Sequence, residues 1–204
     1  MAQTSTTLSG AKSHRVDISG ADISFTSTSG VYTIKSTSTV LTGAGKLAAL
    51  DLVTVTNSSS NNSTFTIKAV VSTTEFTVEE IVTDETADGS TSVTLDHTGF
   101  VTDKAKGDGY YSQPDGVHTV AYQIVNLGDS TDDFNGTIKM QGTLATTPTE
   151  DDWFDISGTT LTSDQSTTNH AYNFTGNFVW VRAKTETSNA SGNPSMVTSI
   201  LLNN

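Results

Sequence analysis

The segment Gly176–Thr185 contains the densest run of large apolar side chains in the chain. Successive side chains of an extended strand point to opposite faces, so one face carries Phe178, Trp180 and Arg182 and the other carries small aliphatic residues. A strand that is apolar on both faces belongs in the interior of a two-layer β structure and not at its edge. We therefore expect a packed β domain with Trp180 in its core.

Composition indicates that the rest of the chain is also β structure. Of 204 residues, 34% are hydrophobic and 16% are charged, while 38 are Thr and 25 are Ser. Thr favours strands because its branched side chain suits a pleated, half-buried surface. The sequence predicts an all-β protein with a thin core and a hydroxyl-rich surface. There is no Cys, which excludes disulfides and thiolate metal sites.

Charge limits the possible partners. The net charge is −12, and the acidic excess extends over both halves of the chain. Phosphate backbones bind clustered Lys and Arg, and the sequence contains no basic run, so we expect no nucleic-acid partner. No segment is apolar for 18 residues, and the first ten residues lack the basic start and apolar run of a secretory signal, so we expect no membrane partner either.

A change of pattern at residues 97–116 divides the chain. This stretch holds four of the 16 Gly and shows no sustained alternation. We expect an N-terminal arm with a first strand at 1–30, a small β domain at 31–98, a linker at 99–116 and a β-sandwich domain at 117–204. The small polar residues at the start are expected to order only against a neighbouring subunit.

Short alternating segments at hairpin spacing predict an antiparallel barrel or sandwich for the first domain. Phe65, Ile67 and Ala69 are expected to share a buried face, as are Phe76 and Val78. The helix-like patch Lys46–Leu50 is at most a turn. The predicted strands are Ser19–Thr26, Val31–Lys35, Leu50–Thr56, Thr64–Val71, Glu75–Glu79 and Ser92–Asp96.

Longer strands predict a jelly-roll-like β-sandwich for the second domain. Turn-forming residues separate these strands, including the acidic turn Leu127–Asp133 and the Pro-containing turn Thr146–Glu150. The predicted strands are Val117–Asn126, Gly136–Leu144, Trp153–Ile156, Ala171–Phe174, Phe178–Thr185 and Met196–Leu202.

Three segments of the second domain carry a resemblance: Asn135–Gly142, Asp151–Ile156 and Asn173–Ala183. Together they resemble a β-sandwich module that is widespread in virion structural proteins of tailed bacteriophages. The region from Val40 to Leu95 is similar to another small phage β module, which usually has Gly-Asp where this chain has Leu50-Asp51. The resemblance implies a virion structural protein, and neither module carries catalytic residues.

No combination of residues in the sequence predicts catalysis. The four His lack metal-ligand spacing, so we expect them to be surface or capping residues and predict no metal site, cofactor or catalytic residue. The acidic turns Asp129–Asp133 and Glu150–Asp152 are interpreted as Asp-capped turns, with a calcium site as the alternative. The neighbouring Asp151 and Asp152 would point apart on an extended backbone, unlike a glycosidase pair.

Four aromatic residues are the candidate contacts to a partner or a glycan. Tyr110 and Tyr111 are adjacent in the expected linker, where aromatic rings usually dock against protein. Trp153 lies beside acidic residues, and Tyr172 lies on a predicted strand.

The resulting hypothesis is a non-enzymatic structural protein on the outer surface of a tailed-phage virion, specifically a capsid decoration (cement) protein. We expect a homo-oligomer, a trimer, that contacts the major capsid protein or another virion protein. The alternative is a tail or neck fibre or adhesin component that binds host-surface glycan. A secreted polysaccharide hydrolase is a third interpretation, which would require turnover that depends on one Asp.

Overall fold

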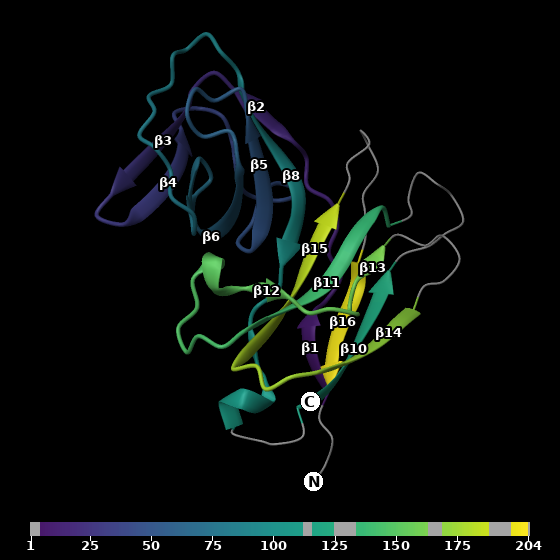
Figure 1. Cartoon of the computed structure of the whole chain (residues 1–204). Helices are drawn as coiled ribbons and strands as arrows, with labels where there is room; N and C mark the ends of the chain where they lie inside the picture. Colours follow the sequence, from purple (N-terminus) through teal and green to yellow (C-terminus); the bar gives the residue numbers. More distant parts are fainter. Residues whose placement is uncertain (1–4, 112–115, 125–133, 163–168, 188–196, 204) are drawn as a thin grey trace. The chain divides into compact units, whose positions relative to one another are not determined.

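The computed structural model describes residues 5–111, 116–124, 134–162, 169–187 and 197–203. These residues form antiparallel strands and two single-turn 3-10 helices, which confirms the all-β prediction. The chain divides into two compact units, and Figure 1 labels strands of both. We call Arg15–Phe100 the inserted unit, and Met1–His14 together with Val101–Asn204 the terminal unit.

The inserted unit is one antiparallel run of strands in the order β2-β8-β5-β6-β7-β4-β3. Its apolar side chains meet in a single cluster, in which Phe25, Ile34 and Phe76 are fully buried. The strands are β2 (Ile18–Gly20), β3 (Ile23–Thr28), β4 (Val31–Ser36), β5 (Asp51–Thr56), β6 (Thr64–Ser72), β7 (Glu75–Val78) and β8 (Val93–Val101).

The predicted faces of β6 and β7 are confirmed with one exception. Phe65, Ile67, Phe76 and Val78 are buried, whereas Ala69 is exposed. The register of β6 against β7 shifts between Ile67 and Ala69, and such a bulge turns the next side chain to the other face. Lys46–Leu50 contains no helix, as expected.

The terminal unit consists of two sheets. One has the order β1-β16-β10-β14, and the other has the order β12-β11-β15-β9, with β13 also paired to β11. Its elements are β1 (Ser5–Ser9), β9 (Ala105–Lys106), η1 (Asp108–Tyr111), β10 (Val117–Ile124), β11 (Gly136–Thr143), η2 (Glu150–Asp152), β12 (Phe154–Asp155), β13 (Leu161–Thr162), β14 (Asn169–Thr175), β15 (Trp180–Thr187) and β16 (Val197–Asn203).

The two sheets of the terminal unit bury apolar side chains between them, which gives a β-sandwich. Tyr122 of β10, Met140 of β11 and Ile200 of β16 are among its fully buried residues. The Tyr122 hydroxyl donates to the Thr159 carbonyl over 2.9 Å, which satisfies the one polar atom of this core side chain.

The prediction that Trp180 lies in the core is wrong. Within β15 the buried face consists of Val181, Ala183 and Thr185, and Trp180 is half-buried on the opposite face. Phe178 precedes the strand and does not share the Trp180 face. It is buried beside the His118 and Phe174 rings. The strand is nevertheless central, since it pairs with both β11 and β9.

The start of the chain also differs from the expected arm. Ser5–Ser9 pairs with β16 of the same chain, and Lys12 bridges to Val197 by two backbone hydrogen bonds of 2.8 and 3.0 Å. The expected linker, residues 99–116, contains the end of β8, all of β9 and η1. The acidic turn at 129–133 lies outside the described residues.

Candidate functional site

The face of the β12-β11-β15-β9 sheet that points away from the sandwich core carries a group of basic and aromatic side chains. Trp180, Arg182 and Lys184 alternate with the buried residues of β15 and therefore lie on this outer face. Lys106 is the register partner of Trp180, and Lys139 is that of Lys184. We call these residues and their neighbours the outer-face surface. Its members are Lys104, Lys106, Tyr110, Lys139, Glu150, Trp153, Trp180, Arg182 and Lys184.

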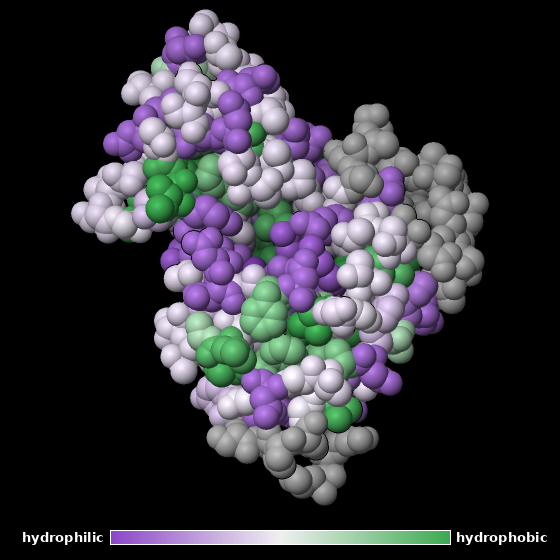
Figure 2. Space-filling model, viewed as in Figure 1, coloured by the Kyte–Doolittle hydropathy of each residue, from purple (hydrophilic) through white to green (hydrophobic). Residues whose placement is uncertain are grey.

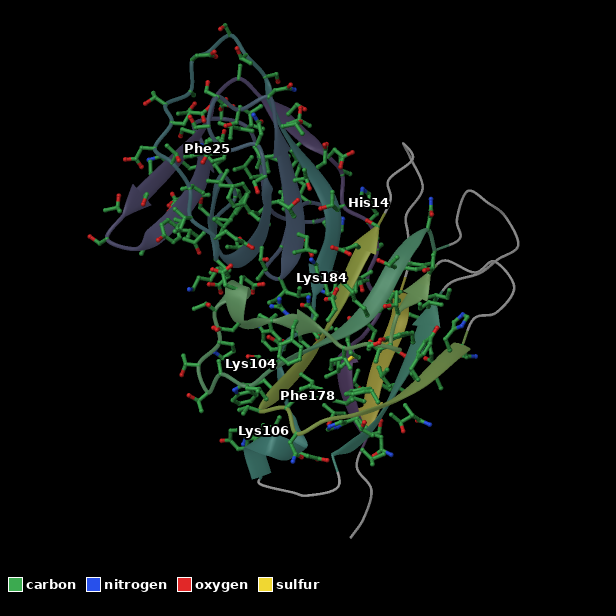
Figure 3. The ribbon with its side chains drawn as sticks, viewed as in Figure 1. His14, Phe25, Lys104, Lys106, Phe178 and Lys184 are labelled. Atoms are coloured by element: carbon green, nitrogen blue, oxygen red, sulfur yellow. The ribbon has the colours of Figure 1, made fainter. Side chains whose placement is uncertain are left out.

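The aromatic part of this surface is built from Tyr110 and Trp180. Their ring centroids lie 5.0 Å apart with a tilt of 55°. Lys104 Nζ is 4.8 Å from the Trp180 ring centroid, and Lys106 Nζ is 4.1 Å from that of Tyr110. The two ammonium groups therefore lie at cation–π distance from two neighbouring rings. Figure 3 labels Lys104 and Lys106 close together, near Phe178.

Two glycines place Tyr110 in this position. Gly107 and Gly109 donate backbone hydrogen bonds to the carbonyls of Val179 and Phe178, at 3.1 and 2.9 Å. A Cβ atom at Gly107 would lie 2.4 Å from the Phe178 carbonyl oxygen, and one at Gly109 would lie 2.5 Å from that of Asn177. Only glycine permits so close an approach, so the turn η1 is held tightly against the segment before β15.

Trp180 is fixed through its indole nitrogen. Trp180 Nε1 donates to the Thr146 carbonyl over 3.0 Å, in a part of the structure that is open to solvent. The Trp180 ring is half-buried, and Tyr110 is 44% exposed. In Figure 2, hydrophilic side chains cover β11 and β15, and a hydrophobic area adjoins them on the same side of the terminal unit.

Trp153 belongs to a second part of the same surface, where the Arg182 guanidinium lies over its ring. The Arg182 guanidinium carbon lies 4.2 Å from the Trp153 ring centroid, and Glu150 binds the same guanidinium by hydrogen bonds of 2.7 and 2.6 Å. Gln141 accepts a third hydrogen bond from Arg182 at 3.0 Å. Arg182 therefore stacks on an aromatic ring and pairs with a carboxylate at the same time.

Lys139 and Lys184 of this surface form ion pairs. Lys139 Nζ lies 2.9 Å from Asp155 and 3.2 Å from Glu186, and Lys184 lies 2.9 Å from Glu186. Burial opposes the charge on Lys139, but its hydrogen bonds to Asp155 and Glu186 outweigh burial and raise its pKa. Burial likewise opposes the charge on Asp155. The hydrogen bond from Lys139 outweighs the effect of burial, so the pKa of the Asp155 carboxyl is lowered.

The other two candidate aromatics lie elsewhere or cannot be placed. Tyr172 is on β14 of the second sheet, where its ring packs 5.5 Å from that of Tyr122. Tyr111 closes η1, but its side chain lies outside the described residues. The structure thus brings Tyr110 and Trp153 to the outer-face surface and places Tyr172 apart from them.

Two of the four His are buried, which corrects the expectation that they are surface or capping residues. His97 accepts a hydrogen bond at Nδ1 from the Arg15 amide over 3.3 Å, and its Nε2 lies 3.7 Å from Asp51. His118 is stacked on Phe174 and lies 4.0 Å from the buried Asp108. These His are enclosed in the interiors of their units, and the Asp51 neighbour of His97 comes from a distant part of the sequence.

Asp152 and Asp22 each hold a turn through hydrogen bonds. The Asp152 carboxylate accepts from the Thr149 amide and hydroxyl at 2.7 and 2.8 Å, and the backbone bond followed by the hydroxyl bond lowers its pKa. Asp22 accepts from four residues of the segment Ser36–Thr39. Within the described ranges, no three His, Asp or Glu side chains are grouped closely enough to hold a metal ion.

A shallow groove of about 270 Å³ lies on the inserted unit, between β4, β6 and β7. Tyr32, Ala69 and Val78 contribute to its largely apolar lining. Its two charged residues, Lys68 and Glu79, pair with each other at 2.9 Å. The groove therefore offers apolar contact and little chemistry for an acid or base.

Comparison with protein-family models, with curated proteins and with solved structures finds no match for this chain. In the part of the chain that the structure describes, no helix is both long and apolar enough to cross a membrane.

Proposed function

We propose that this chain is a non-enzymatic structural protein of a tailed-phage virion, displayed on the outer particle surface as a capsid decoration protein. One observation carries the proposal: parts of the three segments with the virion-module resemblance lie on the adjacent strands β12, β11 and β15 of one sheet, while Asn173–Thr175 of the third segment lie on β14 of the other sheet. Gln141 of β11 is the register partner of Asp155 on β12 and of Arg182 on β15. This adjacency supports the proposal, because segments that are separate in the sequence meet in one sheet.

The non-enzymatic part of the proposal is supported by the structural contacts of the candidate acids and bases. Glu150 binds Arg182, Asp152 holds the turn before β12, and Asp155 binds Lys139. His97 and His118 are enclosed, so neither is presented to a substrate. A general acid or base must lie within hydrogen-bond reach of a bound substrate, and the enclosed positions of His97 and His118 are unsuited to that role.

The proposed partners are further copies of the chain, as a trimer, and the major capsid protein or another virion protein. An acidic, hydroxyl-rich exterior suits the outside of a particle, because the DNA-filled interior favours positive charge. Light scattering of the purified chain should give three times 21.5 kDa. A monomeric mass at micromolar concentration would contradict the trimer.

Copy number tests the position in the particle. Gel densitometry of purified particles should give on the order of hundreds of copies, because a decoration protein follows the symmetry of the capsid lattice. A dozen copies or fewer would contradict the capsid position and favour the tail or neck.

The second candidate function is a tail or neck fibre or adhesin component that binds host-surface glycan. The Tyr110 ring, which is 44% exposed and lies beside Trp180, favours it, since exposed aromatic rings are common sugar platforms. Low copy number together with sugar binding by the intact chain would support this candidate over decoration.

A further inference from the structure

We infer that the segment Thr83–Glu85 of the inserted unit is a latch, which covers the outer edge of β3 and opens in acid. Every residue of this unit is described, including the latch and the two elements that hold it. The inference concerns a conformational device of the fold and does not rest on the proposed virion function. Failure of one therefore leaves the other unaffected.

The latch lies along the edge of the last strand in the inserted unit. Among the strands of this unit, β3 pairs with β4 alone. On the other edge of β3, Phe25 and Glu85 exchange two backbone hydrogen bonds of 2.9 and 3.0 Å. The Asp84 carboxylate accepts a hydrogen bond from the Ser27 amide on that same edge. An open strand edge is a template for pairing with other chains, so the latch protects the sheet.

The Glu85 carboxylate binds the latch to the loop between β5 and β6. Four donors of this loop meet its oxygens at 2.6–3.0 Å, and they are the Ser58 hydroxyl, the Ser59 and Ser60 amides and the Asn61 side-chain amide. Such charge-assisted bonds are about twice as strong as bonds between neutral groups. Burial opposes the charge on Glu85, but these bonds, led by that of Ser58, outweigh burial and lower its pKa.

Asn61 holds the latch in a second way. Its side chain accepts a hydrogen bond from the Thr83 amide at 2.8 Å and donates one to the Thr83 carbonyl at 3.0 Å. Apolar packing contributes less, because Val82 before the latch is buried while Thr83 and Asp84 are exposed. Closure therefore depends mainly on polar contacts, and those of Glu85 are strongest when its carboxyl is ionised.

Protonation of Glu85 is the step that opens the latch. The two elements packed against its carboxylate, the loop Asn57–Asn62 and β3, contain no Asp, Glu, His, Lys or Arg, so neutral donors hold it. A carboxyl whose pKa is lowered in the closed form stabilises closure above the ordinary Glu value of about 4.3, and this stability is lost as the pH falls below that value. The other carboxyls between β7 and β8 bind elsewhere, and they are Glu79, Glu80, Asp84 and Asp88.

Amide hydrogen exchange of the full chain, followed by NMR and corrected for intrinsic rates, tests the inference. Between about pH 6 and about pH 3, the protection of the Phe25 and Thr83 amides should fall by about tenfold, because both amides donate within the closed latch. Leu95 is fully buried on β8, which pairs with β2 and β5, and its amide should keep its protection. Leu95 thus separates opening of the latch from unfolding of the unit.

Glu85→Gln mimics the protonated carboxyl. At about pH 6 this variant should already show the tenfold loss at Phe25 and Thr83, with little further change in acid. Glu75→Gln is the matched control, because it removes the same charge from β7, which pairs with β4 and β6, and it should behave as the parent does. The acid series of the parent remains decisive if Glu85→Gln fails to fold, and the variant at about pH 6 remains decisive if the parent unfolds in acid.

Three results would overturn the inference. Unchanged protection of Phe25 and Thr83 in the Glu85→Gln variant would show that the segment stays closed without the charge. An equal loss at Leu95 would show unfolding of the whole unit and not a local opening. An equal loss in the Glu75→Gln variant would assign the effect to net charge and not to the contacts of Glu85.

Discussion

Arg182 and Glu150 form a two-pronged ion pair, with Nη1 and Nη2 at 2.7 and 2.6 Å from the two carboxylate oxygens. The arginine side chain is 7% exposed and the glutamate 21%, so the pair is largely withdrawn from water. A guanidinium in such a place depends on its carboxylate, because water cannot replace it.

Glu150→Gln should therefore lower the free energy of unfolding by about 3 kcal/mol, since it leaves the buried Arg182 charge uncompensated. Urea denaturation followed by circular dichroism measures the change. The neighbouring Asp151 is exposed, so Asp151→Asn removes one charge from the same turn and should have almost no effect. Equal stability of the Glu150→Gln variant and the parent would show that the ion pair contributes nothing.

Gly109→Ala should destabilise the chain by about 1–3 kcal/mol, because the new methyl group would meet the Asn177 carbonyl at 2.5 Å. The shift of η1 should also move Tyr110 away from Trp180 and change the Trp fluorescence. Gly10→Ala is the matched control, since its Cβ atom would meet nothing within 4 Å. If both variants unfold at the same temperature, the tight approach at Gly109 does not constrain the turn.

Because of Asp22, the stability of the inserted unit should decrease as the pH falls through the acid range. The Ser36 hydroxyl, followed by that of Thr39, lowers the pKa of Asp22 far below its usual range. A carboxyl whose pKa is depressed by folding adds stability above its unfolded pKa of about 3.9, and this stability is lost as the pH falls below that value. Asp22→Asn should lower the melting temperature at pH 7. The melting temperature of this variant should also decrease less steeply than that of the parent as the pH falls below about 4.

Thermal unfolding at a series of pH values measures this effect. Ser36→Ala removes one donor to Asp22 and should give a smaller loss in the same direction. An unchanged acid slope in the Asp22→Asn variant would assign the acid sensitivity to other carboxyls.

Tyr122 should dominate the response to alkali. Burial raises the pKa of its phenol well above its ordinary value, although the bond to Thr159 opposes the shift. A raised phenol pKa adds stability that is present below about pH 10 and is lost as the pH rises further. Tyr122→Phe should weaken this alkaline loss and cost about 1 kcal/mol at neutral pH, because the Thr159 carbonyl loses its donor.

Absorbance of the phenolate provides the measurement. In the parent chain, ionisation of Tyr122 should appear only together with unfolding. If the folded parent shows one more reversible phenol ionisation than the folded Tyr122→Phe variant, Tyr122 is not enclosed.

The strands were largely predictable because alternation is a local property of the sequence. The segment from Thr64 to Val71, for example, coincides with β6 to within one residue. The inward face of β15 was not predictable, since both faces are apolar in sequence. Bulk suggested that Trp180 is inside, but the sandwich interior at that position accommodates the smaller Val181 and Ala183.

The candidate surface was only partly predictable. Tyr110 could be selected as an aromatic in the expected linker and Trp153 as an aromatic beside acidic residues, whereas Lys104 and Lys106 gave no signal because the sequence contains no basic run. Their significance comes from the pairing of Lys106 with Trp180, which depends on sheet register between distant segments. The burial of His97 likewise depends on Asp51, 46 positions earlier in the sequence.

The pairing of β1 with β16 has a consequence for synthesis on the ribosome. Thr6 lies opposite Leu202, so the first strand must wait for the last before their shared sheet can close. The inserted unit emerges complete between them and contains all the strands of its own core cluster. Vectorial synthesis therefore allows Arg15–Phe100 to fold first, while the sandwich assembles only after translation has delivered β16.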